Sequence, residues 1–184
     1  MKFVAKGSRG KLKRPKSKID LFNIAGFIFY RSHRGDLHTL GECHTAETFN
    51  NLRADLYKFA TASYFTELLD LFTVVEDPNE ELFSLIENTF KNLEAGKDPK
   101  FLRCLLEIKL MQYTGHIPDF SKFEDVSNGT KAVIKNILDS RALDRLKLSA
   151  AQISEINSLL RLAIDYLLGK RVKSLSFLES MGVG

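Results

Sequence analysis

Several residue types are scarce in this 184-residue chain: tryptophan is absent, cysteine occurs twice, and residues 1–18 hold no acidic side chain. Cys43 and Cys104 are far apart and form no CxxC pair, which excludes a four-cysteine zinc site and argues against a disulfide framework. The longest apolar run, residues 24–30, is too short to span a bilayer, and residues 1–18 lack the apolar stretch of a signal peptide. We therefore expect a cytoplasmic protein with two buried thiols and no membrane contact.

The lack of acids at the N-terminus leaves a strongly basic segment. Eight of the 27 lysines and arginines lie in residues 1–18, so residues 19–184 carry 19 cations against 23 acids. The net charge of +4 therefore combines a segment of +8 with a remainder of about −4. Lysine and arginine gain affinity for nucleic acid by releasing the counterions condensed on its phosphates, whatever the base sequence. Nucleic acid is the leading candidate partner, and the alternative is a passive, solvated terminus.

The character of the sequence changes near residue 46. Before it, aromatic and β-branched residues predict three strands, at residues 2–6, 21–31 and 37–43. After it, apolar residues recur with helical spacing, first over residues 52–72. Later helix starts are indicated by the pairs Asp77/Pro78, Asp98/Pro99 and Ser149/Gln152, and Gly169 indicates a helix end.

These patterns predict a mainly α fold. We expect a helical bundle over residues 46–184 and a small antiparallel β region over residues 1–45, which resembles an incomplete OB-fold.

No specific catalytic pattern is present: we find neither a nucleophile with its base, nor paired catalytic carboxylates, nor a phosphate-binding loop. His33, His38, Cys43 and His44 lie close in the sequence and suggest metal ligands. Regular alternation, however, would place His38 and His44 on one strand face and Cys43 on the other. We therefore expect no enzyme activity, no cofactor and no metal.

Aromatic and basic residues are interleaved in the second predicted strand. Alternation places Phe27 and Phe29 on one face and Tyr30 on the other. We expect Phe27 and Phe29 to be core residues. For Tyr30 two interpretations stay open, a core side chain or a platform for base stacking beside Arg31 and Arg34.

Three groups of residues resemble the bacterial RecO family of recombination mediators. Val4–Arg9 (VAKGSR) with Arg14–Ser17 (RPKS) is similar to the basic loop of that family. Phe101–Arg103 (FLR) is similar to its central helix, together with Glu107, Leu110, Gly115 and Pro118. Gly169–Arg171 (GKR) is similar to its C-terminal signature, together with Lys173–Leu175 (KSL) and Phe177–Glu179 (FLE).

The resemblance implies an OB-fold followed by a helical domain, and a protein of the bacterial nucleoid. It further implies binding to single- and double-stranded DNA, strand annealing, and partnership with RecR and with the acidic tail of the single-stranded-DNA-binding protein. The residues expected to neutralise phosphates are Lys6, Arg9, Lys11, Lys13, Arg14, Lys16 and Lys18. Tyr30, Arg31 and Arg34 complete the predicted nucleic-acid-binding set.

Two departures from the family are expected to matter. Only three of the five strands of an OB-fold are predicted, as though the chain lacked roughly 30 to 40 residues before the third strand. Exposed strand edges would then invite pairing with another chain, so three interpretations stay open: a homodimer, a rearranged N-terminus or a truncated gene sequence. Many members also carry a four-cysteine zinc module, whereas residues 119–129 of this chain hold no cysteine, so we expect no zinc.

The central helix is the predicted site for a protein partner. An acidic peptide with an apolar end would contact Leu102, Arg103, Leu106 and Lys109. A surface ion pair between Arg103 and Glu107, four residues apart, is an equally open interpretation. For the whole chain the alternative is a non-catalytic helical adaptor that binds protein and has a passive basic head.

Overall fold

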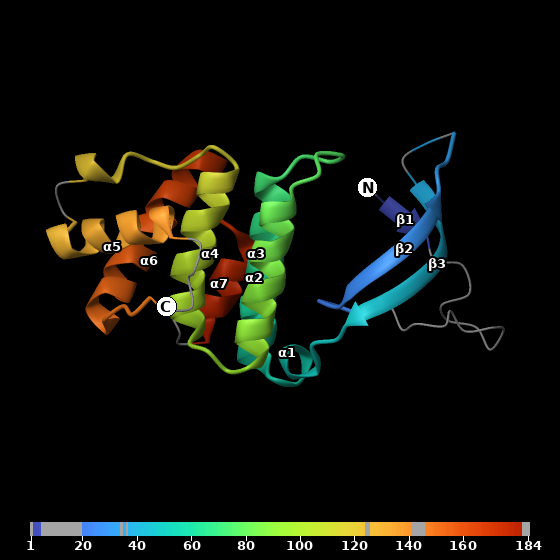
Figure 1. Cartoon of the computed structure of the whole chain (residues 1–184), viewed down its shortest axis with the longest axis horizontal. Coiled ribbons are helices and arrows are strands. Elements are labelled where there is room, and N and C mark those ends of the chain that lie inside the picture. The colour runs from blue at the N-terminus through green and yellow to red at the C-terminus, as the bar shows by residue number, and fades with distance from the viewer. Residues whose placement is uncertain are drawn as a thin grey trace.

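The structure is a computed structural model of the whole chain, and it describes residues 2–4, 20–33, 35, 37–123, 126–140 and 146–181. A small sheet lies at one end of an elongated molecule, and a helical body forms the rest (Figure 1). All described strands end by residue 47, and the described helices begin at residue 50. The fold is mainly α with a small N-terminal β region, as predicted. The division into two domains near residue 46 stays a prediction.

Three strands form the described sheet, in the order β1-β3-β2. Their bounds are β1 (Lys2–Val4), β2 (Ile24–Tyr30) and β3 (Leu37–Glu47). β2 pairs with β3 in antiparallel fashion, which confirms the predicted antiparallel region. β1 pairs with β3 in parallel, on the side of β3 opposite β2.

β3 contains two bulges against β2. Ile28 pairs with Glu42 and Phe29 pairs with Leu40, so Gly41 is an extra residue between them. The register also skips Ala46, because Ile24 pairs with Glu47 and Ala25 with Thr45. A bulge reverses which face the following side chains occupy, and this changes the composition of both faces of the sheet.

Most helices begin at a side chain that caps their free backbone N–H groups. The helices are α1 (Asn50–Ala54), α2 (Leu56–Phe72), α3 (Glu80–Glu94), α4 (Pro99–Tyr113), the 3-10 turn η1 (Phe120–Lys122), α5 (Asn128–Asp139), α6 (Ala150–Leu168) and α7 (Lys173–Ser180). Asp98 caps α4 with Pro99 in its first turn, and Ser149 and Gln152 form a reciprocal capping box at α6, as predicted. Gly169 ends α6 with a φ of 61°.

Two predicted helix boundaries are wrong. The helix expected over residues 52–72 is broken at Asp55, whose side chain accepts a hydrogen bond from Lys58 N at 2.9 Å and so starts α2 anew. α3 begins at Glu80, two residues after Pro78, because Asn79 accepts a hydrogen bond from Leu82 N at 2.9 Å. Asp77 is therefore not the cap of α3.

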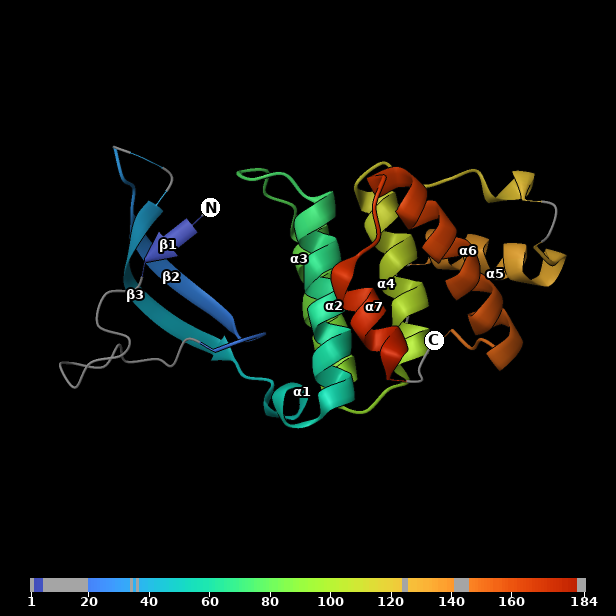
Figure 2. The same ribbon diagram turned by 180° about the vertical axis from the view of Figure 1, so that it is seen from behind.

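α4 lies at the centre of the body and packs against α2, α3, α5 and α6. Every residue from Leu102 to Met111 is buried, polar side chains included. α7 packs across α2 on the side seen in Figure 2. α2 and α3 lie between α4 and the sheet, so the core of the protein is helical and the sheet extends from its edge (Figure 1).

Candidate nucleic-acid interface

Tyr30 and Arg31 are the two predicted nucleic-acid-binding residues that fall within the described part of the chain. They lie at the end of β2 and directly after it. The others lie outside the described residues: Lys6, Arg9, Lys11, Lys13, Arg14, Lys16, Lys18 and Arg34.

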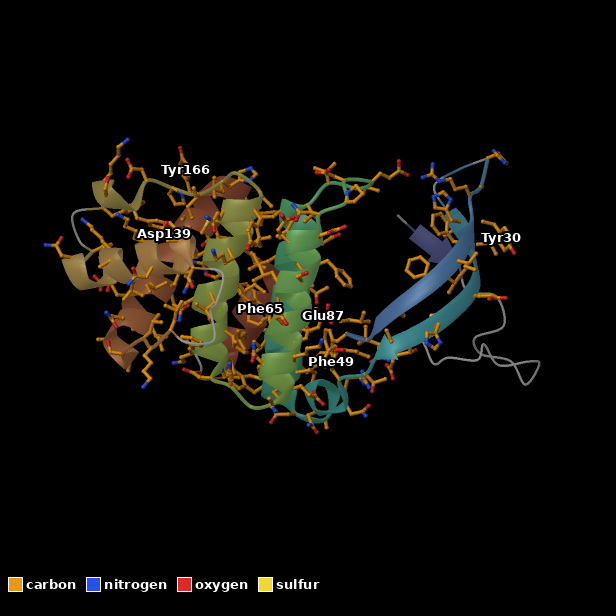
Figure 3. All side chains as sticks on the ribbon, in the orientation of Figure 1. Tyr30, Phe49, Phe65, Glu87, Asp139 and Tyr166 are labelled. Atoms are coloured by element: carbon orange, nitrogen blue, oxygen red, sulfur yellow. The ribbon has the colours of Figure 1, made fainter. Side chains whose placement is uncertain are left out.

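Tyr30 is an exposed side chain, with 67% of its surface accessible to solvent. It projects from the side of the sheet that faces away from the helices (Figure 3). The interpretation of Tyr30 as a core side chain is therefore wrong, and its interpretation as a platform for base stacking stays a prediction.

The opposite face of the sheet carries Phe27 and Phe29. Their ring centroids are 6.1 Å apart, which confirms the predicted shared face. The expectation that both are core residues is wrong, because Phe27 is 47% exposed and Phe29 is only half-buried. Both rings are therefore less buried than a core position requires.

The bulge at Gly41 also corrects the predicted arrangement of the histidines. Phe29 contacts His38 at 5.7 Å, and Cys43 pairs with Phe27, so His38 and Cys43 share a face. His44 pairs with Gly26 and lies on the other face. Among the described residues no group of three or more His, Cys, Asp or Glu side chains could hold a metal ion.

Arg31 is held by an acid of the helical body. Its Nη2 donates a hydrogen bond to Glu76 Oε1 at 3.2 Å, and both side chains stay largely exposed. Glu76 lies in the loop between α2 and α3 and has a φ of 68°, an uncommon conformation for a residue with a side chain. The cation next to Tyr30 is thus partly neutralised in the free protein.

Arg53 of α1 fastens the chain that leads into β2. Its guanidinium donates hydrogen bonds to Leu21 O, to Asn23 Oδ1, both at 2.8 Å, and to Asn50 Oδ1 at 2.6 Å. Asp20 lies 3.7 Å away as a further acidic partner. This cluster fixes the direction in which β2 leaves the helical body.

An aromatic cluster supports the same junction. Phe22 has a φ of 65° and places its ring 5.4 Å from that of Phe59 and 5.7 Å from that of Phe90. Phe49 packs edge-on against Phe90 at 5.8 Å, near the end of β3 (Figure 3). Lys91 Nζ lies 2.9 Å from Glu47 Oε1 and so ties α3 to the end of β3. The base of the sheet is therefore attached firmly, and at the other end of β2 Arg31 adds its contact with Glu76.

The four predicted partner-binding residues lie inside the bundle. Leu102, Arg103, Leu106 and Lys109 are all buried in α4, so their expected location at the surface is wrong. The reason is that α4 is surrounded by four helices, which leaves it no fully exposed face. Leu102 and Arg103 border hollows of the surface. A role of these four residues in partner binding stays a prediction.

The Arg103–Glu107 pair forms as the spacing predicted, but in the interior and not at the surface. Arg103 Nε donates to Glu107 Oε1 at 2.6 Å, and the hydroxyl of Tyr64 donates to the same oxygen at 2.5 Å. The Arg103 guanidinium also lies 5.3 Å from the centre of the Tyr64 ring. These contacts neutralise a buried carboxylate, which would otherwise be strongly unfavourable in the core.

Burial and charge shift the proton affinities of this cluster. Burial raises the pKa of Tyr64 well above its ordinary value, and the Glu107 carboxylate adds to that. Burial alone would lower the pKa of Arg103, but Glu107 holds it above its ordinary value. Burial also raises the pKa of the Cys104 thiol. All three groups therefore stay protonated at neutral pH.

Lys109 reaches the end of α5 from within α4. Its Nζ donates hydrogen bonds to Gln112 Oε1 at 2.9 Å and to Leu138 O at 3.0 Å. Burial lowers the pKa of Lys109, which the Asp139 carboxylate partly opposes. Lys109 thus connects α4 to the C-terminal end of α5.

Comparison with known proteins shows what the chain is similar to. Residues 53–123 match the family described as "Recombination protein O C terminal". A DNA repair protein RecO of Desulforamulus reducens is 25% identical over 215 residues, which cover 98% of this chain and 83% of that protein. This chain is similar to RecO proteins over nearly its whole length.

Other RecO proteins give the same result. RecO of Syntrophus aciditrophicus is 26% identical over 216 residues, which cover 97% of this chain and 83% of that protein. RecO of Listeria monocytogenes is 30% identical over 119 residues, which cover 65% of this chain and 46% of that protein. The resemblance inferred from three groups of residues is confirmed, and these RecO relatives support a role in DNA repair and recombination. None of the helices that the structure describes is long and apolar enough to cross a membrane.

Three residues that shape the sheet or tie it to the helical body were not predicted from the sequence: Glu76, Arg53 and Gly41. The contact of Glu76 with Arg31 could not be predicted, because nothing in the sequence of a loop between two helices indicates a partner near a strand. Arg53 was likewise hidden within a helical pattern. Gly41 did carry a signal, since a glycine inside a strand often marks a bulge or a close approach of another group.

Proposed function

We propose that this protein is a non-catalytic mediator of DNA repair and homologous recombination. It binds single- and double-stranded DNA without sequence preference and promotes the annealing of complementary strands. It acts together with RecR and with the acidic tail of the single-stranded-DNA-binding protein. The observation that supports this most is the relationship to RecO over nearly the whole chain.

The mechanism follows from the distribution of charge. The cations of residues 1–18 neutralise phosphates, while residues 19–184 carry a small excess of acids that repels DNA from the body. Two strands bound at one basic segment repel each other less, so complementary bases can meet. The firm attachment at Arg53 and Phe22 keeps the base of the sheet fixed while its far end meets DNA.

The outer position of β2 in the described sheet supports the proposal of a homodimer. In the described sheet β2 is an outer strand, with β3 on one side and no described strand on the other. An edge strand offers unpaired N–H and C=O groups to a second copy of the chain. Light scattering of the protein alone, over a range of concentrations, measures whether a dimer forms.

A second candidate function is a helical adaptor with a passive basic head. It is favoured by a hollow of about 540 Å³ between the segment that follows α4 and the C-terminal part of α6. Leu162, Tyr166 and Leu167 line it and are exposed. An exposed apolar patch of this kind is typical of protein–protein contact.

Charge-neutralising substitutions distinguish the two functions. We expect the substitution of Arg9, Lys11, Lys13 and Arg14 by glutamine to weaken binding to both single-stranded and duplex DNA by about tenfold or more. The measurement is fluorescence anisotropy of a labelled oligonucleotide at fixed salt. Under the adaptor alternative, neither the parent protein nor the variant binds DNA.

A matched control removes the same charge elsewhere. Substitution of Lys122, Lys131, Lys135 and Lys147 by glutamine lowers the net charge equally but changes only the helical body. We expect this variant to bind DNA nearly as the parent does. Equal losses in both variants would contradict the assignment of the basic segment as the DNA-binding region.

A further inference from the structure

The outer face of the sheet presents one exposed aromatic ring in a supported position. We define this face by Ile28, Tyr30 and Leu37, all exposed. Ile28 and Tyr30 are two residues apart on β2 and so point to the same face. Their partners on β3, Glu42 and Thr39, lie on that face too, and so does Leu37, two residues before Thr39. Glu42 is an acid on it, and Arg31 directly follows Tyr30 in the chain.

The Tyr30 ring lies close against the backbone at Gly41. A Cβ atom at position 41 would lie 2.8 Å from Cε2 and 3.5 Å from Cδ2 of Tyr30, and 3.3 Å from the carbonyl oxygen of Ile28. One edge of the ring therefore rests against the bulge of β3, in space that only glycine leaves free. The rest of the ring stays exposed.

We propose that Tyr30, supported by Gly41, is a stacking platform for an unpaired base of single-stranded nucleic acid. This inference rests on the proposed function, because it needs the neighbouring cations to hold the phosphates. A base presents a flat π face that fits an exposed aromatic ring, and such stacking is tolerant of sequence. In a duplex the base faces are covered by their neighbours, so the platform favours single strands.

Arg31 lies where it can bind a phosphate next to the stacked base. It follows Tyr30, and its side chain is 64% exposed although it pairs with Glu76. A phosphate next to the stacked base competes with Glu76 for this cation. An exposed ion pair is weak enough to be exchanged in this way.

The test separates base stacking from phosphate binding. The probes are oligothymidylate, an abasic strand of equal length with the same phosphates, and a duplex. Stacking of one base is worth about 1–3 kcal/mol, so we expect Tyr30→Ala to weaken binding of oligothymidylate by roughly 5- to 150-fold. Binding of the abasic strand and of the duplex stays unchanged, and Tyr30→Phe retains the parent affinity.

Gly41→Ala tests the support without removing the ring. We expect the added methyl group to push the Tyr30 ring aside and to reduce the preference for oligothymidylate over the abasic strand. The matched control is Tyr166→Ala, which removes an exposed tyrosine (87% accessible) at the opposite end of the molecule (Figure 3). It leaves all three affinities unchanged.

A direct readout uses the absence of tryptophan from the chain. In Tyr30→Trp the indole is the sole tryptophan, and we expect oligothymidylate to quench its fluorescence while the abasic strand does not. Equal affinity of the parent for oligothymidylate and the abasic strand would overturn the platform but leave the proposed function standing. No binding to any of the three probes would overturn both.

A change of oligomeric mass in Tyr30→Ala, with the preference for bases intact, would also overturn the platform. It would identify the outer face as a contact between two copies of the chain.

Discussion

The Glu107 carboxylate lies in the interior of the helical body, with Arg103 Nε 2.6 Å from it and the Tyr64 hydroxyl 2.5 Å from it. A buried charge is tolerable only while its partners remain, so the three side chains act as a unit. The unit joins α2 to α4 and fixes how the two helices face each other.

Replacing Glu107 by glutamine leaves the Arg103 guanidinium without a counter-charge. We expect Glu107→Gln to lower the free energy of unfolding by about 3–5 kcal/mol, as found when one partner of a buried pair is removed. Urea denaturation followed by circular dichroism measures the loss. The control is Glu87→Gln, which removes an ion pair with Lys91 at the surface and should cost below about 1 kcal/mol.

The double variant Arg103→Met with Glu107→Leu removes both charges at once. We expect it to recover most of the stability lost in Glu107→Gln, because apolar side chains of similar size need no counter-charge. A Glu107→Gln variant as stable as the parent would show that the carboxylate is not paired in the way the structure shows.

Residue types alone could not reveal this burial. The spacing of Arg103 and Glu107 correctly predicted their pair, but the same spacing occurs on exposed helices. What places the pair inside is the number of helices around α4, and that is decided by tertiary packing. For the same reason Leu102, Leu106 and Lys109, which we expected at the surface, are buried in the core.

Elements were predicted best where a capping side chain defines them. Asp98 with Pro99, Ser149 with Gln152, and Gly169 all act as the sequence indicated, because they satisfy backbone groups of their own helix. Asp77 with Pro78 has the same pattern, yet Asn79 is the cap. Neighbouring residues there offer competing caps, and the local sequence does not decide between them.

Sheet geometry was predicted less well, and Gly41 explains why. Period-2 alternation assumes that no residue is skipped, and the bulge breaks that assumption within β3. The expected face of Cys43 was therefore wrong. Phe27 and Phe29 on the regular strand β2 kept their predicted shared face.

The contact between β2 and the α2–α3 loop yields a prediction about DNA binding. We expect Glu76→Gln to free Arg31 and to strengthen duplex binding by up to about fivefold, since exposed ion pairs are worth about 0–1 kcal/mol. The slope of log affinity against log salt should become steeper by the contribution of about one phosphate contact. Duplex titrations at several salt concentrations measure both effects.

Glu47→Gln is the matched control for this contact. It removes an equal charge and breaks the exposed pair of Glu47 with Lys91, at the end of the sheet that joins the body. If both variants change DNA affinity to the same extent, the effect comes from net charge, and the Arg31–Glu76 contact plays no specific part.

The whole molecule has two parts along its length. One end carries the sheet, and the helical body supplies the core and the surfaces available to proteins (Figure 1). The charge polarity was predictable from the sequence, because residues 1–18 hold eight cations and no acid. The elongated shape was not, because it depends on the sheet being left uncovered by the helices.

The salt dependence of DNA affinity tests this central claim most directly. If seven cations of the basic segment each contact a phosphate, a plot of log affinity against log salt should have a slope of roughly −6 on a duplex and about −5 on a single strand, for any base sequence. We predict these slopes for the intact chain. A slope near zero, or an affinity that depends on base sequence in the duplex, would contradict the account.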